Sequence, residues 1–398
     1  MEFIQRTEFL ERLIAFKDMP VIKILTGIRR CGKSTLMEIY KEWLLGHGVE
    51  AVQIVSVNFE DFDNFGLRDP AALHAYVTGH LAEERMTYIF FDEIQHVMDF
   101  PDVVNSLHIK RNVDLYITGS NARLLSGEIA TLLSGRYVEI SMLPLSLREY
   151  SDGIGDRFGL QEKYAQYASF GAFPFTLFLP GSTEKLSYLS GIYDSVIVKD
   201  IMLRHRISDP LMLESVVRFA ADNIGNILSS KKIADTMGTN GRKIDQKTVE
   251  RYLSALCEAF VLYRVGRYNI RGRQLLKSLD KYYLVDMGLR RLLLGSKAYD
   301  VGRVLENIVF LELARRGKKV YVGRIDELEV DFVATDNDGT TYYQVAASVR
   351  DETTLKRELA SLRRIQDSYP KYILTLDDDP DSDYDGIRRT NAIRWLLG

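Results

Sequence analysis

The sequence predicts an α/β protein that begins, over residues 1–150, with a doubly wound domain on a parallel sheet. Short strand-like runs alternate with helical runs, and the short runs are almost continuously apolar or β-branched. Strands of that composition are typical of parallel sheets that helices cover on both faces. The runs are VIKILTG (21–27), AVQIVSVNFED (51–61), MTYIFFDEI (86–94), VDLYITGS (113–120) and GRYVEISM (135–142).

The composition is that of a folded chain with two or three domains. Of the 398 residues, 46% are hydrophobic and 11% aromatic, which suffices for packed cores and excludes global disorder. The net charge of −3 gives no overall attraction to nucleic acid or anionic lipid. With two cysteines, no signal-peptide core and no membrane-length apolar run, we expect a cytoplasmic protein without a membrane partner.

Two further segments follow the first domain. Residues 151–300 are mainly helical, and within them a helix, a glycine-rich turn, a second helix and two strand-like runs predict a winged helix. Residues 301–398 alternate helix and strand again, and the turn at 337–339 predicts a hairpin. We expect a helical and winged-helix middle domain and a small C-terminal α/β domain.

The turn after the first predicted strand has the spacing G-x-x-x-x-G-K-[ST]. Its glycines let consecutive backbone N–H groups turn inward around a phosphate, and the positive end of the next helix adds to the attraction. The lysine would reach the β and γ phosphates, and the serine hydroxyl would take one Mg²⁺ position. We expect a site for ATP and Mg²⁺ built by Gly27, Ile28, Arg29, Arg30, Cys31, Gly32, Lys33, Ser34 and Thr35. The two arginines either add positive potential or project into solvent.

Polar residues at the ends of later strands complete such a site. Asp92 would hold Mg²⁺ directly or through water, and Glu93 would orient the attacking water. Ser120 and Asn121 end the next strand, where a polar group could contact the γ-phosphate or the water. Arg136 precedes the last strand. It either neutralises charge in the transition state, in its own subunit or across a subunit boundary, or forms a surface ion pair.

With these motifs, residues 20–145 resemble the core of an AAA+ ATPase, a P-loop NTPase: GIRRCGKST, YIFFDEI, TGSN and LLSGRY carry the resemblance. The later stretches PLSLREY, GAFP, KYYLVDMGL, LEN and EVDFV extend it over nearly the whole chain. Over that length the chain resembles prokaryotic AAA+ ATPases with a C-terminal domain of unknown function. The resemblance implies a winged-helix middle, a C-terminal restriction-endonuclease-like domain, and assembly into rings, although the long appendages also suit a monomer or dimer.

The predicted winged helix, residues 229–281, is strongly basic. It holds 12 Lys or Arg against 5 Asp or Glu. Clustered cations of this kind suit the phosphates of DNA or RNA, while a lid on the ATPase core is the alternative. The basic residues are Lys231, Lys232, Arg242, Lys243, Lys247 and Arg251 around the expected recognition helix, and Arg264, Arg267, Arg271 and Arg273 around the wing.

The third segment matches the order of a metal-dependent nuclease site. The matching residues are Glu306, Asp331 and Gln344. Gln344 stands where a carboxylate is commoner, and Ala346 stands where such a site usually has its lysine. Arg350, Lys356 or Arg357 could substitute. We therefore expect a non-catalytic binding or scaffold domain in place of an active nuclease.

These observations lead us to expect an ATPase that couples hydrolysis to rearrangement of its winged-helix and C-terminal domains while it binds nucleic acid. The first alternative is an ATP-gated, metal-dependent DNA nuclease of a defence or mobile-element system. The second is a protein-binding signalling ATPase without a nucleic-acid role.

Overall fold

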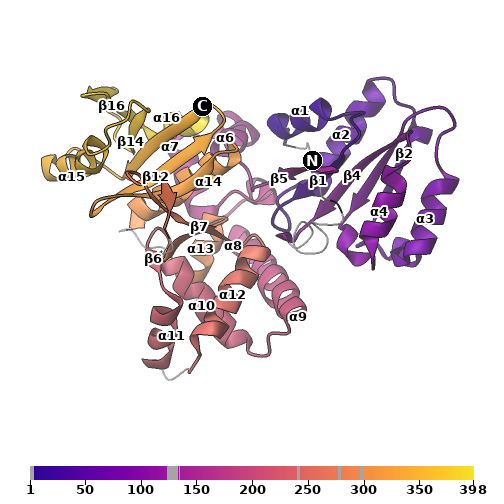
Figure 1. Ribbon diagram of the computed structural model, residues 1–398, viewed down its shortest axis with the longest axis horizontal. Helices are drawn as coiled ribbons and strands as arrows, with labels where there is room; N and C mark the ends of the chain where they lie inside the picture. Colours follow the sequence, from indigo (N-terminus) through magenta and orange to yellow (C-terminus); the bar gives the residue numbers. More distant parts are fainter. Residues whose placement is uncertain (1–3, 123–132, 134, 240–242, 277–278, 296–299) are drawn as a thin grey trace. The chain divides into compact units, whose positions relative to one another are not determined.

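The structure is a computed structural model that describes residues 4–122, 133, 135–239, 243–276, 279–295 and 300–398. The contacts that residues make in space divide the chain into two compact units (Figure 1). The first comprises Met1–Met142 and Glu258–Phe260, and the second comprises Leu143–Cys257 and Val261–Gly398. Arg242, expected near the recognition helix, lies outside the described residues.

The first unit contains a parallel sheet with the strand order β2-β3-β4-β1-β5. Each of the five predicted runs forms one of its strands, so the prediction of a parallel α/β sheet is confirmed. The carboxyl ends of β1, β3 and β4 meet at one edge, because parallel neighbours run in the same direction. The strands are β1 Ile22–Thr26, β2 Ile54–Asn58, β3 Thr87–Asp92, β4 Val113–Gly119 and β5 Tyr137–Ser141.

Helices pack on both faces of this sheet. The helices are α1 Thr7–Ala15, α2 Lys33–Gly46, α3 Pro70–Gly79 and α4 Phe100–His108, with short 3₁₀ segments at Ala51–Gln53, Phe62–Arg68 and Ile94–His96. Side chains alternate between faces along a strand. On one face, Tyr116 of β4 contacts Tyr40 of α2, with ring centroids 5.0 Å apart.

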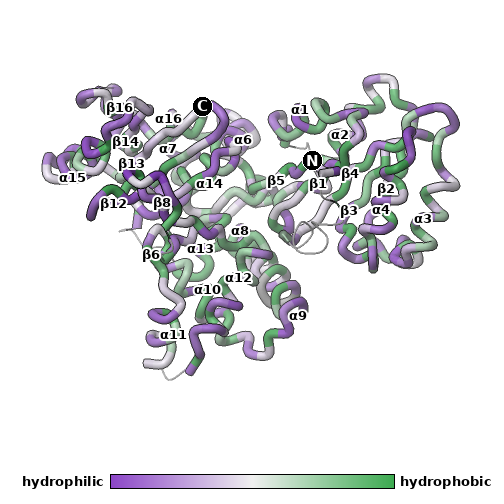
Figure 2. Tube along the Cα trace, in the orientation of Figure 1, coloured by the Kyte–Doolittle hydropathy of each residue, from purple (hydrophilic) through white to green (hydrophobic). Residues whose placement is uncertain are grey.

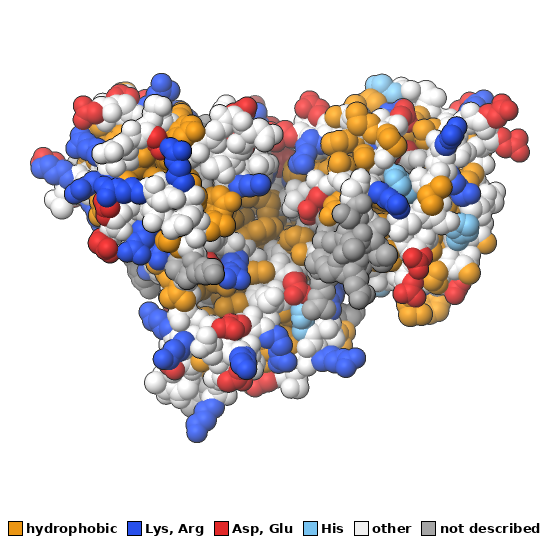
Figure 3. Space-filling view, in the orientation of Figure 1, with side chains coloured by type: hydrophobic (Ala, Val, Ile, Leu, Met, Phe, Trp, Pro, Cys, Tyr) orange, Lys and Arg blue, Asp and Glu red, His pale blue; other side chains and the backbone are white. Residues whose placement is uncertain are grey.

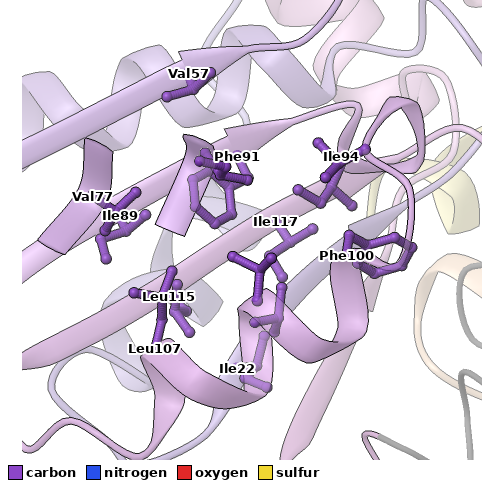
Figure 4. Packing of buried hydrophobic residues seen from close by; sticks show 14 of the residues in the cluster. Ile22, Val57, Val77, Ile89, Phe91, Ile94, Phe100, Leu107, Leu115 and Ile117 are labelled. Carbon is purple, nitrogen blue, oxygen red and sulfur yellow. The ribbon is translucent and has the colours of Figure 1, made fainter. Parts of the chain in front are cut away.

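The other face forms a continuous hydrophobic core. Phe91 and Ile117, on neighbouring strands, pack there with Phe100 and Leu107 of α4 (Figure 4). Because Phe91 is fully buried, its truncation to alanine would cost about 3–5 kcal/mol. The near-continuous apolar character that predicted these strands therefore reflects burial on both faces. Figure 2 shows the hydrophobic character of β2 to β4, in contrast to the hydrophilic α15 and α11 of the second unit.

The second unit begins with helices and contains two sheets. Its helices are α6 Leu147–Ile154, α7 Leu160–Phe170, α8 Ser182–Tyr193, α9 Met202–His205, α10 Pro210–Asp222, α11 Ser230–Thr239, α12 Gln246–Glu258, α13 Met287–Leu294, α14 Val301–Arg315, α15 Glu352–Arg363 and α16 Ala392–Leu397. Short 3₁₀ segments lie at Gly155–Arg157 and Pro174–Phe178, and a π-helical segment lies at Asp194–Ile201. Among the described residues, no helix is long and apolar enough to cross a membrane.

The smaller sheet is antiparallel, with the order β6-β10-β7. The larger has the order β15-β16-β14-β13-β12-β11-β8-β9. The predicted hairpin at 337–339 joins β12 to β13, where Asp336 pairs with Gly339. The strands are β6 Ile227–Leu228, β7 Leu262–Val265, β8 Arg267–Asn269, β9 Gln274–Leu275, β10 Asp280–Leu284, β11 Lys319–Ile325, β12 Leu328–Asp336, β13 Gly339–Ala346, β14 Lys371–Thr375, β15 Ser382–Tyr384 and β16 Ile387–Asn391.

The segment expected to form the wing belongs partly to the larger sheet. β7 and β10 pair with each other, but β8, between them in sequence, pairs in parallel with β11. Ile270, which follows β8, lies in the hydrophobic core with Val330 and Val333 of β12. Burial of this apolar residue explains why the strand joins the C-terminal sheet, a long-range pairing that the local sequence does not specify.

Candidate nucleotide-binding site

The turn between β1 and α2 has a backbone that its glycines make possible. Gly27 has a φ of +145°, and a Cβ placed there would lie 2.1 Å from the carbonyl oxygen of Met142. Gly32 also has a positive φ, +106°, and it occupies the N-cap of α2 without a capping side chain. An L-residue at Gly27 would collide with backbone, so both conformation and space require glycine. The turn therefore presents main-chain N–H groups beside a helix start.

Lys33 begins α2 and is buried beneath this turn. Its ammonium donates hydrogen bonds to the carbonyl oxygens of Gly27 and Ile28, at 3.0 and 3.3 Å. It also lies 3.6 Å from Oε1 of Glu93. The lysine is thus held in the interior of the turn, as a phosphate ligand requires.

The remaining residues of the turn differ in exposure. Ser34 is exposed and Thr35 half-buried at the start of α2, while Cys31 is fully buried. Arg29 forms an ion pair with Glu60, and Arg30 is exposed with a φ of +68°. The two arginines therefore differ: Arg29 has an acidic partner in the same unit, while Arg30 extends into solvent.

The acidic pair lies at the carboxyl end of β3, on the same sheet edge as the turn. Asp92 accepts a hydrogen bond from Oγ1 of Thr118, on the neighbouring strand β4. The N–H of Glu93 donates to the same hydroxyl at 2.9 Å. Glu93 has a left-handed backbone, with φ of +55° and ψ of +52°, which turns the chain out of the strand. Thr118 thereby holds both acidic residues in position.

The Glu93 carboxylate has several partners besides Lys33. Ser120 donates to its Oε2 at 2.9 Å, and Gln95 also donates to it. Burial alone would raise the pKa of Glu93, but the charge of Lys33 and these hydrogen bonds outweigh it and lower the pKa. Asn121 is buried directly after Ser120. The structure thus brings together the lysine, the acidic pair and the end of β4.

Arg136 lies at the opposite edge of the sheet. Its neighbour Tyr137 pairs with Ile22, at the start of β1, whereas the phosphate-binding turn follows the end of that strand. A strand of this length spans about 16 Å, which is more than an arginine side chain reaches. Arg136 donates to Oδ1 of Asn105 at 3.2 Å. Arg136 and the phosphate-binding turn of its own subunit therefore lie at opposite ends of the strands β1 and β5.

Sequence reasoning missed three residues that support the site. Thr118 and Gln95 hydrogen-bond to the acidic pair, and Arg6 donates from the N-terminal segment to the carbonyl of Cys31 at 3.0 Å. A polar residue inside the apolar run of β4 was a usable signal for Thr118. Nothing in the local sequence indicated Arg6, whose contact spans 25 positions.

The chemistry of this site fits a nucleotide with magnesium. Main-chain amides, a helix start and a buried ammonium suit a polyphosphate. The exposed Ser34 hydroxyl and the Asp92 carboxylate are oxygen ligands of the kind Mg²⁺ prefers, and this ion usually keeps several waters and phosphate oxygens. Such a site does not require a cluster of three protein carboxylates. Among the described residues, no group of three or more His, Cys, Asp and Glu could hold a metal.

The residues of the nuclease-like pattern also meet, in the second unit. The N–H of Asp331 donates to Oε1 of Gln344 at 2.7 Å, and Nε2 of Gln344 donates to Glu358 at 2.7 Å. The glutamine amide is therefore used within the protein. Burial and the charge of Glu306 raise the pKa of Asp331 well above its usual range.

A lysine from another strand joins these carboxylates. Nζ of Lys281, on β10, lies 3.1 Å from Glu306 and 2.7 Å from Glu329. Burial alone would lower the pKa of Lys281, but the charges of Glu306, Asp331 and Glu329 raise it. Sequence reasoning sought the missing cation at Arg350, Lys356 or Arg357. Of these, Arg350 and Lys356 pair elsewhere, with Asp379 and Glu352, whereas Arg357 pairs with Glu358, the partner of Gln344.

Comparisons with known proteins agree with the first unit's geometry. Residues 20–151 match the family described as AAA domain, and residues 161–300 match a domain of unknown function. The fold is similar to a Walker-type ATPase of Pyrococcus abyssi, with a TM-score of 0.50 and 16% identity, over 73% of this chain and 96% of that one. The first unit thus contains a region that matches the AAA domain family.

Two of the relatives match more than nine-tenths of the chain. An uncharacterized protein of Haemophilus influenzae is 38% identical over 99% of this chain and 98% of its own length. One from the archaeon Methanocaldococcus jannaschii is 27% identical over 92% of this chain and 83% of its own. The chain belongs to the same family as the Haemophilus protein.

Proposed function

We propose that the protein hydrolyses ATP with Mg²⁺ and that hydrolysis rearranges its winged-helix and C-terminal parts while they bind nucleic acid. The observation that supports coupling most directly is the pairing of Lys33 with Glu93. A γ-phosphate would compete for Lys33, and its arrival would free Glu93 from one of its partners. Nucleotide binding would thereby change the end of β3 as well as the turn that holds the phosphates.

Each polar residue of the site has a role in this proposal. Amides of the turn and Lys33 bind the phosphates, and Ser34 and Asp92 hold Mg²⁺. Glu93 orients the attacking water, and Ser120, which donates to Glu93, reports the presence of the γ-phosphate together with Asn121. Arg136 would act on a neighbouring copy of the chain, since its own turn is out of reach. The protein is therefore proposed to work as an oligomer.

The proposed nucleic-acid site is the basic region around α11 and α12. The order α10, β6, α11, α12, β7, β10 supports a winged helix, because two helices precede a small antiparallel sheet. Lys247 and Arg251 are exposed one turn apart on α12. Figure 3 shows Lys and Arg side chains, interspersed with carboxylates, over this end of the unit. Lys231, Lys232 and Lys243 are exposed in the same region.

The wing contributes less than its sequence suggested. Arg264 pairs with Asp280, and Arg271 pairs with Asp326 at 2.7 Å. An arginine that is already paired with a carboxylate neutralises DNA phosphates less effectively and so releases fewer counterions from DNA. The basic residues of α11 and α12 are therefore the better candidates for phosphate contacts. Replacing Lys247 and Arg251 by glutamate should weaken binding and reduce its salt dependence. Replacing Lys356, an exposed lysine of α15 that pairs with Glu352, by glutamate should leave nucleic-acid binding and its salt dependence unchanged.

For the C-terminal part we propose a binding or scaffold role. The Lys281 ammonium already balances the carboxylates of Glu306 and Glu329, at the position where a nuclease would need a metal. The alternative is an ATP-gated DNA nuclease. Incubation with plasmid and linear DNA, with Mg²⁺ or Mn²⁺ and with or without ATP, separates the two. Cleavage that Asp331→Ala abolishes would favour the nuclease.

The experiment that tests the main proposal is the ATPase rate against protein concentration, with and without DNA and RNA. A specific rate that rises with concentration supports the oligomer, and stimulation by nucleic acid supports the coupling. A protein-binding signalling ATPase becomes the better proposal if DNA and RNA do not bind even at low salt, where basic-patch binding is strongest. The ATP supply and the low number of cysteines, two in the chain, favour the cytoplasm.

A further inference from the structure

A groove of about 500 Å³ lies at the β15–β16 edge of the larger sheet, beside α16. The other edge of that sheet is formed by β9, near the winged-helix segment in the chain. The groove is thus separate from both the basic helices and the cluster around Lys281. Its walls combine arginines, two aspartates, aromatic rings and the hydroxyls of a serine and a threonine.

Three arginines line the groove and differ in their pairing. Arg389 is buried, with its guanidinium 3.6 Å from Asp379, and Arg394 lies 3.3 Å from Asp381. The side chain of Arg388 is exposed and makes no ion pair or hydrogen bond with any described residue, although Asp383 is its cross-strand neighbour. Two cations are therefore fixed by the acidic segment, and one is available to an anionic ligand.

Ser382 adds an unsatisfied polar atom to the same wall. Its Oγ is buried and has no hydrogen-bond partner among the described residues. Buried hydroxyls in proteins are almost always hydrogen-bonded, because an unpaired one is destabilising. A ligand with a donor or acceptor at this point would supply the missing bond.

The aromatic part of the groove is held rigidly. Tyr372 stacks on Tyr343, with centroids 5.5 Å apart, and Trp395 meets Tyr343 edge to face at 5.6 Å. Arg316 lies over the Trp395 ring, 4.3 Å from its centroid. Rings fixed by their neighbours lose little conformational entropy when a planar group packs against them.

We propose that this groove binds a nucleotide unit. The base would pack against Trp395 and Tyr372, and the phosphate would be held by Arg388. The unit comes from a free nucleotide or from single-stranded nucleic acid, which share this chemistry. The inference does not depend on ATP hydrolysis in the first unit.

The test uses Trp395 as a reporter. The chain has two tryptophans, so Trp43→Phe leaves Trp395 alone, and Lys33→Ala in the same protein removes nucleotide binding at the phosphate turn. AMP and a short oligothymidylate are titrated separately while Trp395 fluorescence is recorded. We expect saturable quenching. Quenching by AMP identifies free nucleotide as a ligand, and quenching by the oligonucleotide alone identifies single strands.

Two charge reversals provide the control. Arg388→Glu should weaken binding about tenfold or more, because it removes a charge-assisted phosphate contact. The control is Arg363→Glu, which alters an exposed arginine of α15 whose ion-pair partner is Asp385. It should leave the affinity unchanged. Arg388→Lys should retain most of it. The proposal is overturned if neither probe quenches, or if Arg388→Glu and Arg363→Glu bind alike.

Discussion

The ammonium of Lys33 lies 3.6 Å from the carboxylate of Glu93 and joins the phosphate-binding turn to the end of β3. One charge belongs to the residue that should hold the phosphates, and the other to the residue that should orient water. In this arrangement each neutralises the other, and the same contact that stabilises the site must loosen for catalysis.

Lys33→Ala should abolish ATP binding, since it removes the buried ammonium that faces the phosphates. We expect affinity to fall about a hundredfold or more, as measured by calorimetry or with a fluorescent ATP analogue. The control is Lys41→Ala, which removes a lysine of the same helix whose partner, Glu38, is exposed. Comparable affinity in both variants would contradict the assignment of Lys33.

Glu93→Gln should keep ATP binding and lose turnover. The substitution preserves shape but removes the negative charge that polarises water, so the rate should fall about a hundredfold or more. Because the pKa of Glu93 is lowered, the carboxylate stays ionised at neutral pH, and the wild-type rate should fall only in acid. Steady-state rates and binding, measured on the same samples, separate the two effects. Normal hydrolysis by Glu93→Gln would exclude Glu93 from the water-orienting role.

Lys281→Met should strongly destabilise the second unit. It leaves Glu306 without the ammonium that balances it in a largely buried cluster, which costs about 3–5 kcal/mol in the free energy of unfolding. Lys318→Met removes an ion pair with Asp336 near the surface and should cost about 1 kcal/mol or less. Urea denaturation of both variants checks this difference. Equal losses in the free energy of unfolding would show that removal of Lys281 does not leave an uncompensated buried charge.

Asp286 should make the stability of the second unit depend on pH. Burial raises the pKa of Asp286 to about 6, from an ordinary value of 3.8, despite hydrogen bonds from the N–H groups of Ala172 and Leu289. The folded protein therefore holds this proton more tightly than the unfolded chain does. The resulting stability is fully present below about pH 4 and is lost as the pH rises through about 6.

Asp286→Asn removes this titration while it keeps the shape of the side chain. The stability of the wild type relative to Asp286→Asn should therefore fall by up to about 3 kcal/mol between pH 4 and pH 7. Denaturation curves of both proteins across that range provide the measurement. Stability profiles that stay parallel over the whole range would show that Asp286 does not titrate as described.

Much of the first unit could be predicted because its signals are local. The five apolar runs became five parallel strands, and the spacing from Gly27 to Ser34 required one kind of turn. The placement of Asp92 and Glu93 beside Lys33 also followed, because parallel strands end at a common edge. Arg136 shows the limit: its order in the chain was compatible with several roles, and only the direction of β5 placed it at the far end of the strand from the turn.

The second unit was less predictable, because long-range pairings govern it. Its wing strand β8 joins β11 across more than fifty residues of sequence, and the cation beside Glu306 comes from β10, not from the neighbouring helix. The sequence by itself determined which residues can bind phosphate and which segments are strands, since backbone freedom and burial patterns are local properties. Only the tertiary structure decided which charges meet, because electrostatic partners are chosen by distance in space and not along the chain.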